Sequence, residues 1–506
     1  MSLALAHSRA RIGVHAPAVR VEVYLSGGLP ALNMVGLPEA AVRESRDRVR
    51  AAIQCAQFEF PARRITVNLA PADLPKDGGR FDLPIALGIL AANGVIEPTA
   101  LSEIEFIGEL ALTGELRAVD GVLPAALAAA SAGHSLIVPA GNGAEAALAG
   151  DVCAYTARTL LEVVAHLNGE KTLPRAVADL RAASQLVYPD LADVRGQAQA
   201  RRALEIAAAG NHHLIFIGPP GGGKTLLAAR LPGLLPPLDD QEAMEAALVA
   251  SACGHALDPA QWRQRRFRAP HHTASAAALV GGGSRPRPGE ISLAHHGVLF
   301  LDELAEWSRR TLDGLREPLE SGVVTISRAA HAEEFPARFQ LVAAMNPCPC
   351  GWAGDPSGRC RCPGEVVARY RARLSGPLLD RIDLHVAVPR LAAHEIRSDA
   401  ARGETTAVVR ARVLAACERQ HQRAGKSNAR LSSAEAERDC GLSPRDSNLL
   451  ERAMHTLQLS ARAAHRILRV ARTIADIEGA DGITTPHLSE AIGYRQLDRG
   501  NVRNAA

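Results

Sequence analysis

Short apolar runs that end in polar side chains recur through the middle of the chain. The runs at 214–217, 298–301 and 341–345 are uninterrupted and have the length of buried strands. Across residues 189–390 such runs alternate with helical segments, which is typical of a nucleotide-binding sheet covered by helices. This region is therefore predicted to be an α/β domain.

The regions on either side have other patterns. Residues 1–167 combine short predicted strands with alanine-rich helices, and the polar, proline-containing stretch 168–188 has the composition of a linker. Residues 391–506 are rich in Ala, Arg, Glu and Leu and are predicted to form a helical bundle. The apolar positions with helical spacing in this last region include Leu459, Ala463, Ile467, Val470 and Ile474.

The run at 214–217 leads into a glycine-rich loop with the complete Walker A pattern. The loop consists of Gly218, Pro219, Pro220, Gly221, Gly222, Gly223, Lys224 and Thr225. Glycines let backbone N–H groups face the phosphates of a nucleotide, and the helix that follows adds positive potential. Lys224 is expected to contact the β- and γ-phosphates of ATP, and the hydroxyl of Thr225 is expected to bind Mg²⁺.

Polar residues also follow the other two runs. Asp302 and Glu303 come directly after 298–301, as in a Walker B motif, where Asp302 would support Mg²⁺ and Glu303 would polarise the attacking water. A helix N-terminus would also favour two carboxylates, but the upstream Walker A loop favours Walker B. Asn346 follows 341–345 and could orient the water or sense the γ-phosphate. It could also simply begin a turn with Pro347.

Two arginines are candidates for contacting phosphate at a distance in sequence. Arg381 lies between Asp380 and Asp383, so a local salt bridge is one interpretation. In an oligomeric ATPase, an arginine here would reach the nucleotide of a neighbouring subunit and stabilise the transition state. Arg462 opens a predicted helix and is either a second phosphate sensor or a solvated residue at a helix start.

Four of the nine cysteines lie within fifteen residues on a Pro- and Gly-rich loop. They are Cys348, Cys350, Cys360 and Cys362. Four clustered thiolates predict a closed, structural zinc site that would staple a segment with few apolar residues. The C-x-C spacing is tighter than the commoner C-x₂₋₄-C, so reduced thiols or a redox pair remain alternatives.

Arginines near flexible loops are the candidate DNA contacts. Arg285 and Arg287 lie in the glycine-rich stretch 281–289, after a basic cluster at 263–268, and Arg328 follows an apolar run predicted to form a hairpin. Contacts to phosphate are independent of sequence and weaken with salt. The alternative is that these arginines pair with acidic neighbours between subunits. Aromatic residues make up 3% of the chain, so base stacking is not expected to dominate.

The order of these motifs resembles that of magnesium-chelatase-like AAA+ ATPases, and more narrowly the ComM (YifB-type) family. The similar segments are the Walker A loop, 288–295, Walker B, 346–351 and 375–383, and the resemblance extends over essentially the whole chain. It implies an AAA+ P-loop core (189–390) with a C-terminal helical lid (391–506), Arg381 as a trans arginine finger and Arg462 as sensor 2. It also implies a hexameric ring that acts on DNA by branch migration, promoting integration of transforming DNA by homologous recombination.

Residues 1–167 resemble the α+β C-terminal domain of Lon proteases. In Lon a segment like 75–82 leads into the nucleophilic serine, but that position here is Arg80. A hairpin like 108–117 follows, and the lysine expected after it is missing. A Ser–Lys dyad needs both members, so the domain is expected to be a scaffold that forms the ring or contacts DNA.

Composition narrows the remaining alternatives. The net charge of +3 favours no particular partner, and no run approaches the roughly 20 apolar residues of a membrane span. The N-terminus lacks the apolar core of a signal peptide, so a cytoplasmic protein with no membrane partner is expected. The main rival to a DNA motor is a chelatase-type ATPase that remodels a protein partner, and an ATP-dependent protease is less well supported.

Overall fold

A computed structural model describes most of the chain as two compact units. The first unit comprises Met1–Gln185 and Met244–Trp262, and the second comprises Leu186–Ala243 and Arg263–Ala506. The described residues are 2–35, 40–74, 76, 78–150, 152–178, 188–255, 257–258, 261–283, 286–327, 332–355, 358–391 and 403–495. Within them, no helix combines the length and apolar character needed to cross a membrane.

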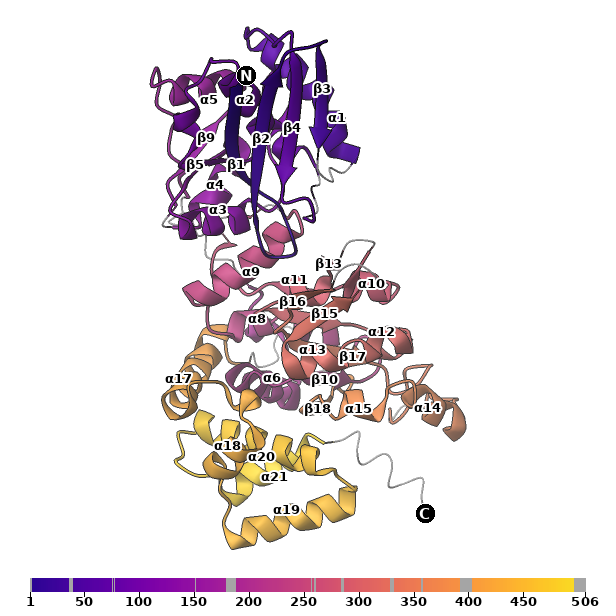
Figure 1. Ribbon diagram of the computed structural model, residues 1–506. Coiled ribbons are helices and arrows are strands. Elements are labelled where there is room, and N and C mark those ends of the chain that lie inside the picture. Colours follow the sequence, from indigo (N-terminus) through magenta and orange to yellow (C-terminus); the bar gives the residue numbers. More distant parts are fainter. Residues whose placement is uncertain are drawn as a thin grey trace. The chain divides into compact units, whose positions relative to one another are not determined.

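The first unit is built on a seven-stranded mixed sheet with the order β3-β4-β2-β1-β5-β8-β9 (Figure 1). Its strands are β1 (Ser2–Arg9), β2 (Ala18–Ser26), β3 (Ala31–Val35), β4 (Arg64–Ala70), β5 (Ile104–Phe106), β8 (Ser135–Pro139) and β9 (Ala154–Ala157). A separate hairpin joins β6 (Glu109–Leu110) to β7 (Leu116–Arg117). Buried and accessible positions alternate along β2 and β4, so one face of these strands packs in the core.

The helices of the first unit are α1 (Ala40–Cys55), α2 (Asp82–Ala92), α3 (Val122–Ser131), α4 (Gly143–Ala147) and α5 (Leu160–Leu167). Every residue of α2 is buried, as expected for a helix that is apolar on all sides after Asp82, whose carboxylate pairs with Arg48. Most of α9 (Asp240–Ala252) also belongs to this unit, although it lies between the Walker A and Walker B motifs in sequence. Its Ser251 hydroxyl donates to Glu145 Oε1 at 2.5 Å.

The second unit is built on a five-stranded parallel sheet with the order β11-β14-β17-β10-β18. Its strands are β10 (Leu214–Ile217), β11 (Phe267–Arg268), β14 (Val298–Leu301), β17 (Gln340–Met345) and β18 (Leu384–Ala387). β14 and β17 are buried throughout because helices cover both faces of a parallel sheet. The predicted α/β fold is confirmed, and its three motif-bearing strands are neighbours.

Short helices and two hairpins surround this sheet. The helices are α6 (Ala198–Gly210), α7 (Lys224–Ala228), α8 (Leu231–Leu234), α10 (Ala276–Leu279), α11 (Glu290–Leu293), α12 (Arg309–Asp313), α13 (Arg316–Ser321), α14 (Gly364–Arg371) and α15 (Gly376–Leu379). The hairpins pair β12 (Gly281–Gly282) with β13 (Arg287–Pro288) and β15 (Val323–Ser327) with β16 (Ala332–Pro336). Single 3₁₀ turns occur at 79–81, 98–101, 140–142, 191–193, 304–306 and 428–430.

The C-terminal part of the second unit is helical. Its helices are α17 (Thr406–Ala424), α18 (Ser433–Asp439), α19 (Pro444–Leu457), α20 (Ala461–Ile477) and α21 (Thr485–Gly493). Ile467, Val470 and Ile474 are buried on one side of α20, at the predicted spacing.

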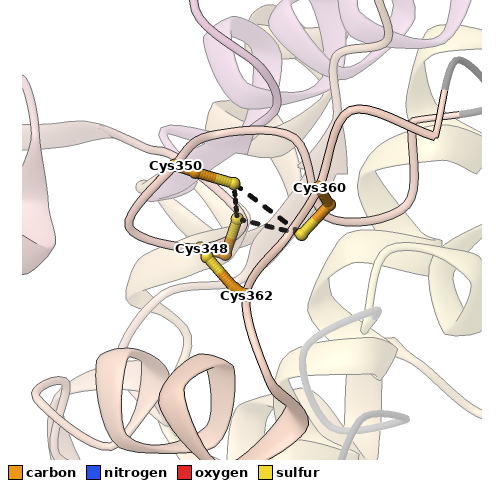
Figure 2. A group of neighbouring side chains, drawn as sticks. All are labelled: Cys348, Cys350, Cys360 and Cys362. Carbon is orange, nitrogen blue, oxygen red and sulfur yellow. Dashed lines mark hydrogen bonds between the residues drawn. The ribbon is translucent and has the colours of Figure 1, made fainter.

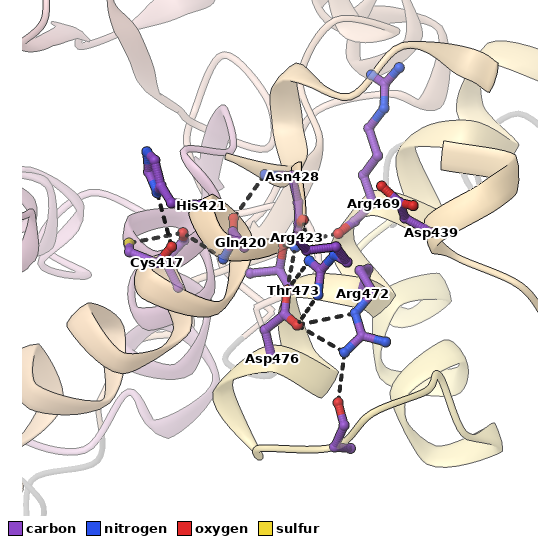
Figure 3. Close-up of polar contacts among 12 residues, drawn as sticks. Cys417, Gln420, His421, Arg423, Asn428, Asp439, Arg469, Arg472, Thr473 and Asp476 are labelled. Carbon is purple, nitrogen blue, oxygen red and sulfur yellow. Dashed lines mark hydrogen bonds and ion pairs between the residues drawn. The ribbon is translucent and has the colours of Figure 1, made fainter. Parts of the chain in front are cut away.

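A buried carboxylate ties these helices together. Figure 3 shows Asp476 accepting hydrogen bonds from Arg423, Asn428 and Arg472. Burial opposes ionisation of Asp476, but these donors hold its pKa below the ordinary value. A buried charge satisfied in this way fixes how α17 and α20 pack.

Candidate functional site

The Walker A loop joins β10 to α7 in a conformation that only glycines adopt readily. Gly221 and Gly223 have φ angles of 75° and 88°, in the left-handed region. At Gly218, a Cβ atom would collide with the carbonyl oxygen of Val388, at the end of the neighbouring strand. The loop therefore depends on glycine both for its turn and for its close approach to β18.

Lys224 lies at the centre of the loop and contacts the end of a second strand. Its Nζ donates to the carbonyl oxygens of Gly218 at 2.7 Å and Pro219 at 3.0 Å, and to Oδ1 of Asn346 at 3.1 Å. Burial lowers the pKa of Lys224, an effect that Asp302 and Glu303 oppose. The structure thus places Lys224 and Asn346 together, although 122 positions separate them in sequence.

Thr225 and Asp302 meet in the same way from β10 and β14. The hydroxyl of Thr225 donates to Oδ2 of Asp302 at 2.8 Å. A hydroxyl and a carboxylate side by side are the hard oxygen ligands that Mg²⁺ prefers. These residues therefore fit the magnesium ion that a Walker site implies.

Glu303 occupies a sharp turn directly after Asp302. Its φ of 49° lies in the left-handed region, which non-glycine residues seldom adopt. Its backbone N–H donates to Oδ1 of Asp302 at 2.8 Å, and the indole of Trp307 donates to the carbonyl oxygen of Asp302 at 3.0 Å. These contacts hold a strained turn in place, and strained backbone conformations of this kind cluster at functional sites.

His272 is a site residue that the sequence did not indicate. Its Nδ1 lies 3.0 Å from Oε2 of Glu303. Spacing along the chain gives no sign of this contact, because 31 positions separate His272 from Glu303. The structure identifies His272 as the side chain that holds the Walker B glutamate.

Among the described residues, Arg381 does not pair with its sequence neighbours Asp380 and Asp383. Its Nη2 lies 2.7 Å from Oε1 of Glu320, on α13, and its Nη1 donates to the carbonyl oxygen of Pro377. Asp383 is instead held by Arg466 at 2.6 Å and by His212 at 3.2 Å. Although burial opposes ionisation of Asp383, Arg466 and His212 hold its pKa well below the ordinary value.

Arg462 lines a strongly basic cavity of about 640 Å³ that contains no Walker A or Walker B residue. Glu320, the partner of Arg381, lines the same cavity. The basic side chains around it are Arg338, Lys426, Arg430, Arg462, Arg466 and Arg469. Arg462 is therefore not gathered with Lys224, Asp302 and Asn346 but lies on the same side of the unit as Glu320 and Arg381.

The four clustered cysteines converge on one point (Figure 2). Their sulfur atoms all lie within 4.8 Å of one another, and all four thiols are free. Cys348 is 3.3 Å from Cys350 and 3.8 Å from Cys360, and Cys350 is 3.7 Å from Cys360. Sulfur ligands at about 2.3 Å from a tetrahedral zinc ion would lie about 3.8 Å apart, so the cluster fits zinc.

The cysteine loop lies directly against the Walker A loop. Gly351 has a φ of 83°, and a Cβ atom there would lie 2.5 Å from Cδ of Pro220. Hydrogen bonds from the backbone N–H of Trp352 and from Cys348 lower the pKa of Cys350 to about 6. A backbone hydrogen bond from Cys350 lowers the pKa of Cys362, but the Cys350 thiol and burial outweigh it and raise that pKa to about 11. The segment after Asn346 thus connects the cysteine cluster to the nucleotide loop.

The predicted DNA contacts are only partly described. Arg287 is exposed at the start of β13, whereas Arg285 and Arg328 lie outside the described residues. Within the basic cluster at 263–268, three arginines pair with carboxylates of the same chain. Arg263 pairs with Asp240, Arg265 with Glu242 and Arg268 with Glu290.

In the first unit, the resemblance to Lon proteases predicts a serine position at Arg80, and this arginine is buried. Arg80 donates to the carbonyl oxygens of Asp120 at 3.0 Å and Gly121 at 3.4 Å, beside a cavity of about 190 Å³. Lys76 is fully buried and donates to the carbonyl oxygens of Pro71 and Leu74. No serine and lysine meet at this cavity among the described residues.

Three adjacent parallel strands that end in a Walker A loop, a Walker B pair and a polar Asn define a P-loop ATPase of the AAA+ type. Comparison with known proteins narrows this class. Family descriptions of magnesium chelatase subunit ChlI match residues 21–142 and 190–396, and its C-terminal region matches 403–495. The chain is 55% identical to "Competence protein ComM" of Haemophilus influenzae, covering 99% of this chain and 98% of the relative.

Other relatives agree with this match. The chain is 52% identical to "Uncharacterized protein YifB" of Salmonella typhimurium, over 99% of this chain and 98% of the relative. It is also 28% identical to Lon protease 2 of Bacillus subtilis, over 39% of this chain and 38% of that protein. The chain belongs to the ComM/YifB family of magnesium-chelatase-like AAA+ ATPases.

Proposed function

We propose that this protein is an ATP-driven DNA motor of the cytoplasm that acts as a hexameric ring. Its task is to promote the integration of transforming DNA by homologous recombination, through translocation or branch migration. The observation that carries the proposal is full-length similarity to a protein named for competence, combined with an assembled ATPase site.

In this proposal each side chain of the nucleotide site has a separate role. Lys224 would exchange its carbonyl partners for the β- and γ-phosphates of ATP. Thr225 and Asp302 would hold Mg²⁺, which would supply positive charge to the transferring phosphoryl group. Glu303, oriented by His272, polarises the attacking water. Asn346, which accepts a hydrogen bond from Lys224, would orient the attacking water.

The remaining charge is supplied by the neighbouring subunit. Arg381 leaves Glu320 and reaches the γ-phosphate bound by the next chain, where it stabilises the transition state. Arg462, in the cavity that Glu320 also lines, acts as a second sensor at that interface. Hydrolysis then changes the contacts between subunits, which shifts the loops that carry Arg285, Arg287 and Arg328 along DNA.

In this proposal the cysteine cluster is a structural zinc centre beside the nucleotide site. Cys348, Cys350, Cys360 and Cys362 would form a closed shell with no open position for substrate. The ion would fix the segment that follows Asn346 and that packs on Pro220.

The test is ATP hydrolysis by the purified protein with and without a labelled four-way DNA junction, followed by analysis of the strand products. We expect DNA to stimulate turnover and the junction to be converted to migrated products. Turnover that is indifferent to every DNA structure would contradict the motor and leave the ATPase intact.

That outcome would favour a second candidate, a chelatase-type ATPase that remodels a protein partner. The chelatase matches across three regions of the chain support it, as does 27% identity to the magnesium-chelatase 67 kDa subunit of Heliobacterium mobile over 39% of this chain.

A further inference from the structure

The segment that follows the cysteine loop carries an unusual concentration of exposed positive charge. We call five arginines the knuckle surface: Arg359, Arg361, Arg369, Arg371 and Arg373. All five are exposed, two of them beside the cysteines and three on or just after α14. Glu365 is the one acidic residue in the sequence from 358 to 373, so this stretch has a net charge of +4. Figure 1 shows α14 at the margin of its unit.

Little of this charge is neutralised by the chain itself. Arg373 pairs with Glu306 at 2.9 Å, and Arg371 donates to the carbonyl oxygen of Pro347 at 3.4 Å. Arg359, Arg361 and Arg369 have no carboxylate within ion-pair distance among the described residues. The basic cluster at 263–268 differs, because three of its arginines are paired with carboxylates. Unpaired guanidinium groups on one exposed segment attract a polyanion.

The chemistry of the surface favours nucleic acid over an acidic protein. The guanidinium of Arg359 lies 4.8 Å from the ring centroid of Trp352, which makes a flat platform of the kind on which bases stack. Arginine side chains spaced along an exposed loop and helix suit a row of phosphates, since each guanidinium can bind phosphate oxygens in a bidentate manner.

The position of the surface connects it to hydrolysis. The same segment begins at Asn346, which contacts Lys224, and passes Gly351, which packs on Pro220 of the Walker A loop. A polyanion held by the knuckle surface would therefore bind a segment whose other end contacts the nucleotide loop.

We propose that the knuckle surface binds the phosphate backbone of DNA and that it is a DNA contact additional to Arg285, Arg287 and Arg328. This inference rests on the proposed function, because it assumes that DNA is the substrate. It assigns to the cysteine cluster the task of ordering the loop that carries Arg359 and Arg361.

The test measures binding of a fluorescein-labelled single-stranded oligonucleotide by anisotropy, from about 50 to 200 mM salt. The variant is Arg359→Ala/Arg361→Ala/Arg369→Ala in the full-length protein. Each phosphate contact contributes about −0.7 to the slope of log K against log salt for single strands. We expect the variant to lose about two units of that slope and to bind at least about tenfold more weakly at 100 mM salt.

Two further variants make the result decisive. The matched control is Arg419→Ala/Arg445→Ala/Arg452→Ala, which removes three exposed arginines from α17 and α19 and should bind like the wild type. The charge-preserving variant Arg359→Lys/Arg361→Lys/Arg369→Lys should retain the salt slope, which separates loss of charge from misfolding of the loop. A lysine variant that loses the slope as fully as the alanine variant would overturn the proposal.

The outcomes distinguish this inference from the function on which it rests. If the wild type binds DNA and the alanine variant binds it with the same slope and affinity, the knuckle surface is not a DNA contact, while the DNA motor stands. If the wild type itself binds no DNA, both are overturned. Equal weakening in the control variant would also contradict the assignment, because the effect would then follow net charge alone.

Discussion

The nucleotide site and the cavity beside Arg80 are both built on a glycine-containing loop with a nearby lysine, and they differ in what that lysine contacts. Lys224 reaches Asn346 at the end of another strand, and Thr225 beside it reaches Asp302. Lys76 is also buried, but among the described residues it donates to carbonyl oxygens of its own loop, those of Pro71 and Leu74.

The difference lies in which groups converge. At the nucleotide site, side chains from three adjacent strands meet where the parallel sheet ends, which is where α/β sheets bind ligands. Beside Arg80, the guanidinium closes against the backbone of Asp120 and Gly121, so the position of the missing nucleophile is filled by a group that stabilises the fold. In this protein, a loop motif therefore forms a candidate catalytic site only where side chains from other strands contact it.

The largest expected effect comes from removing the residue proposed to act across the subunit interface. Arg381→Ala should lower ATP turnover by about 10³-fold or more, because transition-state charge loses its partner. Steady-state hydrolysis measures this, with Arg309→Ala as the control, since Arg309 is an exposed arginine on α12. Turnover within a few-fold of wild type would remove Arg381 from the proposed mechanism.

Glu303→Gln should lower turnover by about 10²-fold while ATP binding persists, since an amide cannot polarise water as a carboxylate does. Binding of a fluorescent ATP analogue and hydrolysis are measured together. Mixing this variant with Arg381→Ala should restore some hydrolysis, because a mixed ring contains interfaces with both an intact Glu303 and an intact Arg381. A mixture as inactive as its parts would argue against action in trans.

Removing two metal ligands tests the cysteine cluster. Cys360→Ser/Cys362→Ser should reduce bound zinc from about one ion per chain to none, because two ligands do not form a closed tetrahedral shell. Metal analysis by mass spectrometry gives the stoichiometry. Cys55→Ser/Cys153→Ser, which changes cysteines outside the cluster, should leave the zinc content unchanged. Wild-type protein that contains no bound zinc after purification would contradict the zinc site.

A smaller effect is expected from His272→Ala, which frees the carboxylate of Glu303. Turnover should fall by roughly tenfold, since misplacing a catalytic group costs less than removing it. His271→Ala is the matched control, because His271 bonds to Thr273 instead of Glu303. Equal turnover in the two variants would mean that the contact of His272 with Glu303 does not position the glutamate.

The smallest expected effect on ATP turnover is that of Arg80→Ser, which restores the residue type of a Lon nucleophile. No peptidase activity should appear, because no lysine that could accept the proton lines this cavity among the described residues. Loss of the bonds to Asp120 and Gly121 should lower the free energy of unfolding by about 1–3 kcal/mol. Urea unfolding and a fluorogenic peptide assay measure the two quantities. Peptide cleavage by this variant would contradict the view of the cavity as a closed scaffold.

Much of the nucleotide site could be predicted because its features are local. The Walker A loop needs glycines at particular φ angles next to a buried strand, and both requirements are visible within a dozen residues. The parallel strands at 298–301 and 340–345 are apolar throughout because both faces are covered, so their polar ends were conspicuous. The clustering of four cysteines on one loop was equally visible.

The sequence by itself therefore determined the class of the protein, the nucleotide loop and the candidate metal ligands, since these depend on short-range backbone geometry and residue type. The tertiary structure alone decided which charges are compensated. Glu320 reaches Arg381, His272 reaches Glu303, and acidic side chains neutralise arginines of the 263–268 cluster, while Arg359, Arg361 and Arg369 remain without carboxylate partners among the described residues. Ion pairs form between side chains that folding brings within a few ångströms, and spacing along a chain carries little information about that distance.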